Sequence, residues 1–308
     1  MAQLDGEGTR SLIDTVARTP LSLIVEWALL FSVVRVGLYF YLRAVPAHQR
    51  GGLFAAGRFL NESLDAIVYA AVFVFMIIRP FFVQAFQIPS GSMVSTLLVN
   101  DYIVANKLIY RYTDPQRGDI VVFRPPKRAC QPWQLDAQGE VNVDFIKRCI
   151  GVPGDVVEMR DNVLYRNGKP ISEAYRHLTT EDPPFQQNTY RELTPDEAKL
   201  EPRFDFKLVK YKGDYWPVTI EGGEVNSRQT AKEYVPKDQL ETADLLSLPA
   251  APIPKGYYLM FGDNRLRSLD GRFWGLVPRE SIVGRSECIW WPLGRWSMTR
   301  RDVGMPAR

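Results

Sequence analysis

The stretch FQIPSGSMVSTL, residues 86–97, decides how the chain is organised, because an apolar segment ends in it and a candidate nucleophile lies in it. Pro89 disfavours helical geometry at the residue before it, so an apolar helix that reaches this point must end here. Gly91 allows backbone angles that other residues avoid, and a tight turn at this glycine can present Ser92. A serine hydroxyl is a weak nucleophile until a base takes its proton, so the stretch predicts a base elsewhere in the chain.

The two histidines are poor candidates for that base. His48 lies in a short basic loop between two apolar segments, and His177 lies in a polar region far from the serine. A Ser-His-Asp triad would need one of them. We therefore expect a base of another residue type.

Lys147 is the candidate base. Strand alternation places Phe145, Lys147 and Cys149 on one face of a predicted strand, and Arg148 on the opposite face, where it can stay in water. Burial disfavours the charged form of a lysine and lowers its pKa, from about 10.4 toward roughly 8. Taken alone, this stretch fits an ordinary surface lysine equally well, and the presence of Ser92 favours the base.

Three stretches together resemble the bacterial type I signal peptidases, the membrane-bound leader peptidases. They are PSGSM at 89–93, DFIKRCIGVPGD at 144–155 and FGDNRLRSLDGRFWG at 261–275, in the order that the family shows. The resemblance covers roughly residues 64–292. It implies a membrane-bound serine endopeptidase that removes N-terminal signal peptides from exported preproteins. Such an enzyme cuts after small residues in an A-x-A pattern and uses no cofactor and no metal.

The resemblance also implies roles for individual residues. Ser92 would attack the peptide carbonyl, Lys147 would take its proton, and Ser268 would hydrogen-bond and orient the lysine. The main-chain N–H of Ser92 and the hydroxyl of Ser90 would form the oxyanion hole, where donors meet the developing charge. The resemblance also implies four structural positions around the site, where the charged side chains would be ion-paired. They are Asp263, Arg265, Asp270 and Arg272. Taken alone, such charges are more often solvated. Six side chains are implied to line two small substrate pockets: Phe86, Ile88, Met93, Leu97, Phe145 and Ile146. The other interpretation is that they pack in the core.

The chain departs from the family pattern at three places. Ser95 stands where proline is usual, and Phe145 stands where tyrosine is common. Leu266 and Arg267 replace an acid and an amide of the third stretch. None of these departures removes a proton-transfer group, so they bear on the rigidity of the loop and on the surroundings of the lysine.

Two apolar segments are predicted to cross a membrane, which takes about 20 residues each. The first, 20–42, carries Glu26 and Arg35 toward its ends, where charged side chains can snorkel to the interface. A helix lying in the interface is the alternative for this segment. The second, 64–85, contains the uninterrupted apolar run 66–78.

The loop between these segments predicts the orientation of the chain. It carries Arg43, Arg50 and Arg58 and no acidic residue between them, and short arginine-rich loops stay in the cytoplasm. Everything after Ile88 is therefore expected outside the cytoplasm. In a bacterial inner membrane this multi-pass protein would present its catalytic domain to the periplasm, with preproteins and membrane lipid as its partners.

From Asp101 onward, short β-branched segments separated by Gly, Pro and Asp predict a mainly β fold. The dipeptide Asn167-Gly168 predicts a tight hairpin. The expected strands include 103–105, 120–123, 141–150, 156–159, 257–261 and 282–290, with a hairpin-like patch at 208–224. The predicted fold class is a signal-peptidase-like antiparallel β catalytic domain with a β insertion subdomain, preceded by two transmembrane helices. The expected division is a tail at 1–19, spans at 20–42 and 64–85, a loop at 43–63, a catalytic core at 86–171 and 251–292, an insertion at 172–250 and a basic tail at 293–308.

Composition limits the other functions that the chain could have. Hydrophobic residues make up 46% and charged residues 24%, which is typical of a folded protein, and the net charge of +3 argues against a strongly basic nucleic-acid binder. Cys130, Cys149 and Cys288 are too few for a zinc site or a disulfide framework, although one pair could form. One alternative is another self-cleaving or processing Ser-Lys protease, against which the membrane segments argue. The other is a catalytically silent, membrane-tethered binding protein, which would not need Ser92 and Lys147 together.

Overall fold

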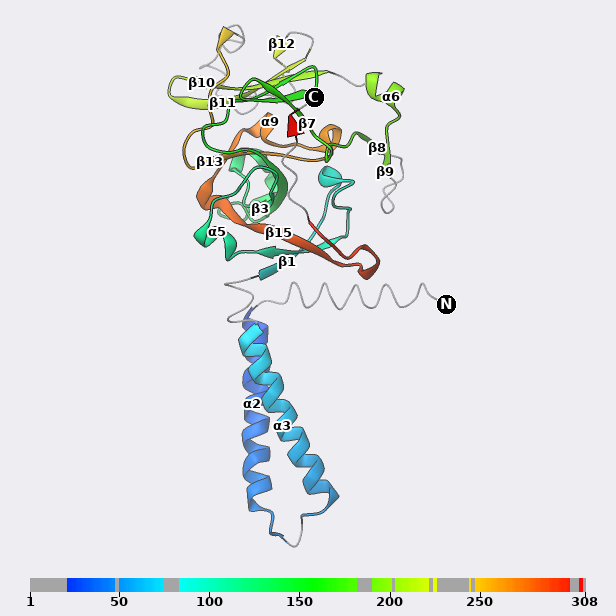
Figure 1. Ribbon diagram of the computed structural model, residues 1–308. Helices are drawn as coiled ribbons and strands as arrows, with labels where there is room; N and C mark the ends of the chain where they lie inside the picture. Colours follow the sequence, from blue (N-terminus) through cyan, green and yellow to red (C-terminus); the bar gives the residue numbers. More distant parts are fainter. Residues whose placement is uncertain are drawn as a thin grey trace. The chain divides into compact units, whose positions relative to one another are not determined.

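The chain divides into two compact units, 1–85 and 86–308, which are described separately (Figure 1). The predicted N-terminal tail, His48 and residues 75–82 of the second predicted span lie outside the described residues. The computed structural model describes residues 21–47, 50–74, 83–181, 190–200, 203–221, 224–225, 244, 247–299 and 305–306.

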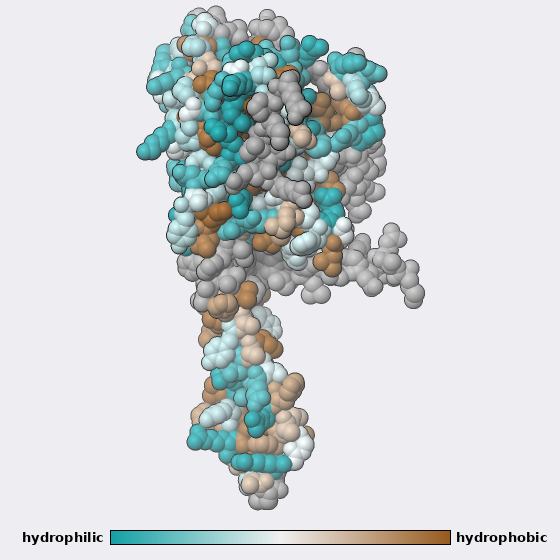
Figure 2. Space-filling model, in the orientation of Figure 1, coloured by the Kyte–Doolittle hydropathy of each residue, from teal (hydrophilic) through white to brown (hydrophobic). Residues whose placement is uncertain are grey.

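Among its described residues, the N-terminal unit has the helices α2 (Leu21–Ala44) and α3 (Gly52–Val72), which pack against each other (Figure 1). Gly57 lets the two backbones approach, because a Cβ at this position would lie 3.2 Å from Leu42 Cδ2. Hydrophobic side chains are exposed along both helices, as Figure 2 shows on the visible face. Apolar residues facing outward are typical of a helix in lipid rather than in water.

One helix among the described residues, over Ser22–Ala44, is long and apolar enough to cross a membrane. The second predicted span does not have the expected bounds, because α3 begins inside the loop predicted at 43–63 and residues 83–87 form a strand. The reason lies in the charges of α3. Arg58 and Glu62 resemble the polar residues of a loop, but they stand four residues apart and form an ion pair on the helix surface, 2.9 Å from Nε to Oε1.

The C-terminal unit is mainly antiparallel β. Within the described residues, one sheet has eight strands in the order β1-β2-β15-β3-β4-β13-β14, with β16 paired to β15. A second sheet has seven strands in the order β12-β11-β10-β5-β6-β7-β17, and β8 pairs with β9. The strands are β1 (Val83–Gln87), β2 (Tyr102–Asn106), β3 (Ile120–Phe123), β4 (Phe145–Gly151), β5 (Val157–Arg160), β6 (Val163–Arg166), β7 (Lys169–Ser172), β8 (Thr179–Glu181), β9 (Tyr190–Glu192), β10 (Phe204–Tyr211), β11 (Asp214–Glu221), β12 (Glu224–Val225), β13 (Tyr257–Phe261), β14 (Leu276–Pro278), β15 (Ile282–Trp291), β16 (Ser297–Met298) and β17 (Met305–Pro306). The short helices are α5 (Ile109–Tyr112), α6 (Pro195–Leu200) and α9 (Gly271–Trp274).

Most of the predicted strands are confirmed, and β3 and β13 have the predicted bounds. The Asn167-Gly168 hairpin is confirmed as well, with φ angles of 53° and 76° in the turn between β6 and β7. The strand predicted at 141–150 begins only at Phe145. Val141 instead forms an isolated bridge with Leu135, so the residues before Phe145 belong to the preceding loop.

The boundary predicted at residue 172 does not separate two sheets. β10 and β11 form the expected hairpin, but β10 also pairs with β5, where Phe206 lies opposite Met159. The reason is a shared core: Phe206 and Leu208 of β10 pack in one buried cluster with Val157 and Phe261. Residues after 172 therefore complete a sheet that begins before it.

The register of β4 positions the chemistry. β4 lies between β3 and β13, with Lys147 opposite Val121 of β3 and Arg148 opposite Phe261 of β13. Because β13 ends at Phe261, the residues that follow it emerge beside the middle of β4. The stretches 144–155 and 261–275 thus meet at one place in the sheet.

Candidate active site

Ser92 lies in a single 3₁₀ turn, Gly91–Met93, directly after the extended residue Ser90. Ser92 is buried, and its Oγ lies 2.7 Å from Nζ of Lys147. The hydroxyl of Ser90 lies 3.3 Å from the same Oγ. Residues 55 positions apart in the sequence thus bring a hydroxyl, an amine and a second hydroxyl together.

Lys147 is 5% exposed, and its surroundings explain the pKa of its amine. Its Nζ also donates to the main-chain oxygen of Ile146 at 3.0 Å, and it lies 5.6 Å from the ring centroid of Phe145. Burial lowers the pKa of the amine to about 8, while the negative charges of Asp270 and Asp263 act in the opposite direction. A buried amine with this pKa has a neutral fraction near pH 7 that can accept a proton.

The hydrogen bond predicted between Ser268 and Lys147 is not formed. The buried Ser268 hydroxyl lies near the Asp270 carboxyl and not on the amine, whose hydrogen bonds go to Ser92 and Ile146. Ser268 packs beside Gly262, where a Cβ would lie 2.3 Å from the serine Oγ. Ser268 therefore lies against the backbone of the third stretch, and only a glycine fits next to it.

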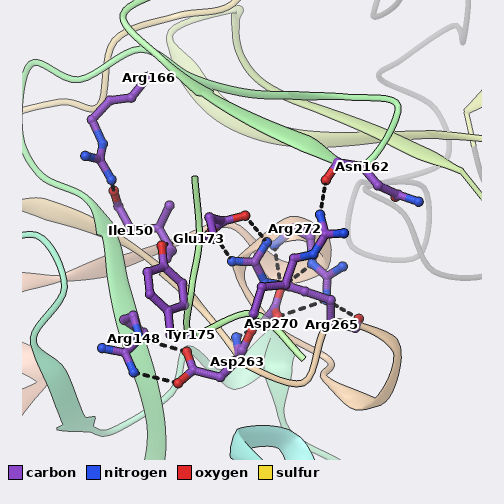
Figure 3. Close-up of polar contacts among 12 residues, drawn as sticks. Arg148, Ile150, Asn162, Arg166, Glu173, Tyr175, Asp263, Arg265, Asp270 and Arg272 are labelled. Atoms are coloured by element: carbon purple, nitrogen blue, oxygen red, sulfur yellow. Dashed lines mark hydrogen bonds and ion pairs between the residues drawn. The ribbon is translucent and has the colours of Figure 1, made fainter. Parts of the chain in front are cut away.

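Arg148 was predicted to stay in water, because it lies on the face of β4 opposite Lys147. This prediction is wrong. Arg148 is 2% exposed and forms a two-pronged ion pair with Asp263, with distances of 2.8 Å from Nε to Oδ1 and 2.6 Å from Nη2 to Oδ2. Its guanidinium carbon lies 4.4 Å from the ring centroid of Tyr175 (Figure 3). The sheet register explains why Arg148 is buried, because Asp263 follows the end of β13 beside Arg148. A buried charge needs such partners.

Three other charged residues of the third stretch, Arg265, Asp270 and Arg272, are also buried and paired (Figure 3), whereas Arg267 is exposed. Arg272 Nε lies 2.8 Å from Asp270 Oδ1, and Arg265 forms an ion pair with Glu173. Burial by itself raises the pKa of the Asp270 carboxyl. Arg272 and the N–H of Gly262 lower the pKa by more than burial raises it, so the pKa lies below its usual range. Glu173 could not be identified from the sequence, because no local pattern connects it with a partner 92 residues away.

Five of the six side chains predicted to line substrate pockets lie in one apolar cluster. Ile88, Met93 and Leu97 are fully buried there, so in this structure they are core residues. Phe86 and Ile146 are half-buried and pack against them. The sixth, Phe145, packs against a neighbouring cluster, with its ring 6.4 Å from that of Phe123.

Two side chains after the nucleophile anchor its loop to other parts of the chain. Thr96 Oγ1 donates to Asp263 Oδ2 at 2.5 Å, and Ser95 Oγ donates to Glu192 Oε1 of β9 at 3.1 Å. Ser95, which replaces the usual proline, therefore supplies a hydrogen bond that a proline could not make.

Comparisons with known proteins identify relatives of this chain. A solved signal peptidase I from Enterococcus faecalis is 27% identical, covers 56% of this chain and 97% of that chain, and has a TM-score of 0.28. A signal peptidase I from Buchnera aphidicola is 32% identical over 269 residues, which cover 76% of this chain and 78% of that protein. The signal peptidase I of Aquifex aeolicus is 33% identical over 243 residues, which cover 74% and 82%. Residues 60–291 match the family described as signal peptidase, peptidase S26. The chain therefore belongs to the signal peptidase family of serine endopeptidases, peptidase S26.

Proposed function

We propose that this endopeptidase removes N-terminal signal peptides from exported preproteins through a dyad of Ser92 and Lys147. The observation that carries the proposal is the 2.7 Å distance between the Ser92 hydroxyl and a buried amine. Burial lowers the pKa of this amine to about 8, so it can act as a base without a histidine. The relatives that bear the name signal peptidase I support the choice of substrate.

The reaction proceeds in two acyl transfers. Neutral Lys147 accepts the proton of Ser92 as Oγ attacks the carbonyl carbon, and the ammonium then gives that proton to the leaving amine of the mature protein. The signal peptide remains as an ester on Ser92. A water molecule gives a proton to Lys147 while its oxygen attacks the ester, and the proton returns to Ser92 Oγ. In both steps the Ser92 N–H and the Ser90 hydroxyl stabilise the oxyanion.

We propose that small residues before the cut are selected by the apolar cluster that contains Met93, the residue after Ser92. Phe86 and Ile146 are half-buried and pack against the fully buried Ile88, Met93 and Leu97. A shallow apolar surface of this kind accepts alanine and rejects a larger side chain by collision. This is the proposed basis of cleavage in an A-x-A pattern.

The proposed location is a bacterial inner membrane, with α2 and α3 both in the lipid and the catalytic unit in the periplasm. The ion pair between Arg35 of α2 and Asp65 of α3 supports this, because Arg35 Nε and Asp65 Oδ1 lie 2.9 Å apart and neutralise each other. Paired charges facing a neighbouring helix are tolerated in lipid, whereas isolated ones are not. The pairing replaces the snorkelling that the sequence suggested for Arg35.

Cleavage of a purified preprotein by the detergent-solubilised enzyme tests the dyad. Ser92→Ala and Lys147→Ala should each lower kcat by at least about 10³-fold, because the nucleophile and the base act as a unit. Two matched changes should keep activity. Ser286→Ala removes another buried serine hydroxyl, and Lys207→Met removes another lysine that donates to a main-chain oxygen, at 2.7 Å. Ordinary cleavage by either dyad variant contradicts the proposal.

A further inference from the structure

Asn264 holds the nucleophile turn on both sides of Ser92. Its side-chain Nδ2 donates to the oxygen of Gly91 at 3.0 Å, and its main-chain N–H donates to the oxygen of Ser92 at 3.1 Å. Asn264 is 0% exposed, so water does not compete for these bonds. The direction of the side-chain amide follows from its partner, because a main-chain carbonyl can only accept. One residue therefore fixes the two peptide groups that flank the nucleophile.

The bond to Gly91 acts on the proposed oxyanion donor. The carbonyl of Gly91 and the N–H of Ser92 belong to one planar peptide group, so a donor that holds the carbonyl also fixes where the N–H points. A hydrogen bond to the carbonyl polarises the peptide and strengthens its N–H as a donor. The N–H of Val94 donates to the same oxygen at 3.2 Å, so the group is held from two directions.

Thr179 holds the Asn264 side chain in turn. Its Oγ1 lies 2.7 Å from Asn264 Nδ2, and Thr179 is 1% exposed. The main chain beside it is also attached. The N–H of His177 donates to the oxygen of Asp263 at 2.8 Å, and the N–H of Arg265 donates to the oxygen of His177 at 3.0 Å. His177 lies just before β8 and Thr179 is its first residue, so both lie outside the three stretches that resemble the family. The main chain of His177 binds both neighbours of Asn264.

We propose that Asn264 and Thr179 are positioning residues for the oxyanion hole. Asn264 aims and polarises the Gly91–Ser92 peptide, and Thr179 keeps the Asn264 amide in place. Neither residue moves a proton. The proposal rests on the Ser92–Lys147 mechanism and adds a distinct expectation, because loss of either support should weaken the oxyanion interaction while leaving the base unchanged.

The test is steady-state cleavage of a preprotein by Thr179→Val, Thr179→Ser and Asn264→Leu. Thr179→Val keeps the side-chain shape but removes the hydroxyl, and kcat should fall about tenfold with KM changed less than about twofold. Thr179→Ser keeps the hydroxyl and should retain the parent kcat. Asn264→Leu removes the donor itself and should lower kcat by about 10²-fold, the scale of a lost oxyanion contact. The midpoint of the pH profile should stay at the parent value in each variant.

A matched control separates positioning from general loss of stability. Thr219 is also 1% exposed, and its hydroxyl donates to the oxygen of Arg272 at 2.7 Å. Thr219→Val should therefore lower Tm as Thr179→Val does, but keep kcat within about twofold of the parent. If Asn264→Leu does not fold, the Thr179 pair and this control still decide the question.

The outcomes distinguish this proposal from the one on which it rests. Equal kcat for Thr179→Val and Thr219→Val, a loss carried by KM alone, or failure of Thr179→Ser to restore kcat would each overturn the positioning role. Ser92→Ala is measured in the same assay. If Ser92→Ala still cleaves, the dyad fails. If Ser92→Ala is inactive while Thr179→Val and Asn264→Leu keep the parent kcat, only the positioning role fails.

Discussion

Lys147 is the residue whose charge limits the proposed reaction. Burial lowers the pKa of its amine to about 8, with Asp270 and Asp263 acting against the shift. The protonated form cannot accept the Ser92 proton, and at pH 7 only about one lysine in ten is then neutral. The 2.7 Å contact with Ser92 means that the neutral fraction is already in place to react.

We predict that kcat/KM rises with pH through a midpoint near 8, the pKa of the buried amine. The sign is fixed because raising the pH removes the proton that blocks the base, so activity is lost on the acid side. An unperturbed lysine would give a midpoint near 10.4 and a histidine one near 6.5. Initial rates of preprotein cleavage from about pH 6 to 10 measure the midpoint. Lys207→Met should not move it, and a parent midpoint near 6.5 would point to a histidine base.

At the scale of secondary-structure elements, an ion pair links helices α2 and α3. Arg35 and Asp65 lie on facing helices with 2.9 Å between Nε and Oδ1, and both side chains are about one-third exposed. Around them, large apolar side chains such as Val33 and Phe59 face outward. A charge that loses its partner in such surroundings has no water to replace it.

We predict that Asp65→Leu or Arg35→Leu alone lowers the amount of full-length protein in the membrane fraction. An unpaired charge within a membrane helix costs up to about 2.5–3.5 kcal/mol, the value for the helix centre. The exchange of both, Arg35→Asp with Asp65→Arg, should restore the parent amount because the pair is formed again. Glu62→Ala breaks an exposed pair with Arg58, which is worth about 0.5 kcal/mol, and serves as the control. An exchange variant as depleted as the single variants would show that the pair does not matter.

At the scale of the whole molecule, the chain combines a helical unit, 1–85, with a β unit, 86–308. The turn between the helices carries arginine on both sides, at Arg43, Arg50 and Arg58, with no acidic residue between them. Basic residues next to a span hold that side in the cytoplasm. Under the proposed topology, in which both helices cross the membrane, we expect the β unit on the opposite side of the membrane from this turn.

We predict that alkaline phosphatase fused after Arg308 is active, since this reporter works only outside the cytoplasm. The same reporter fused after Arg50 should be inactive, because the arginine-rich turn stays inside. Enzyme activity in cells that express each fusion at equal amounts measures the topology. The reverse pattern of activities would place the β unit in the cytoplasm and contradict both the second span and the proposed location.

The sequence by itself determined the features that depend on neighbours along the chain. Strand β3, strand β13 and the Asn167-Gly168 hairpin follow from β-branched residues and turn residues within a few positions of each other. The family membership follows in the same way from three short stretches with recognisable residue order. The pairing of Ser92 with Lys147 came from those stretches, and burial of the lysine from its apolar neighbours.

Only the tertiary structure decided which groups meet across long separations in the chain. Arg148 has a partner 115 residues away in Asp263, and Asn264 has one 85 residues away in Thr179. Alternation along β4 assigned Arg148 to a face but could not show that the second sheet and the third stretch cover that face. The bounds of α3 could not be predicted for a related reason. Its charged residues form ion pairs, Arg58 with Glu62 inside the helix and Asp65 with Arg35 of α2. Such contacts leave no local pattern, since they depend on how separate segments pack together.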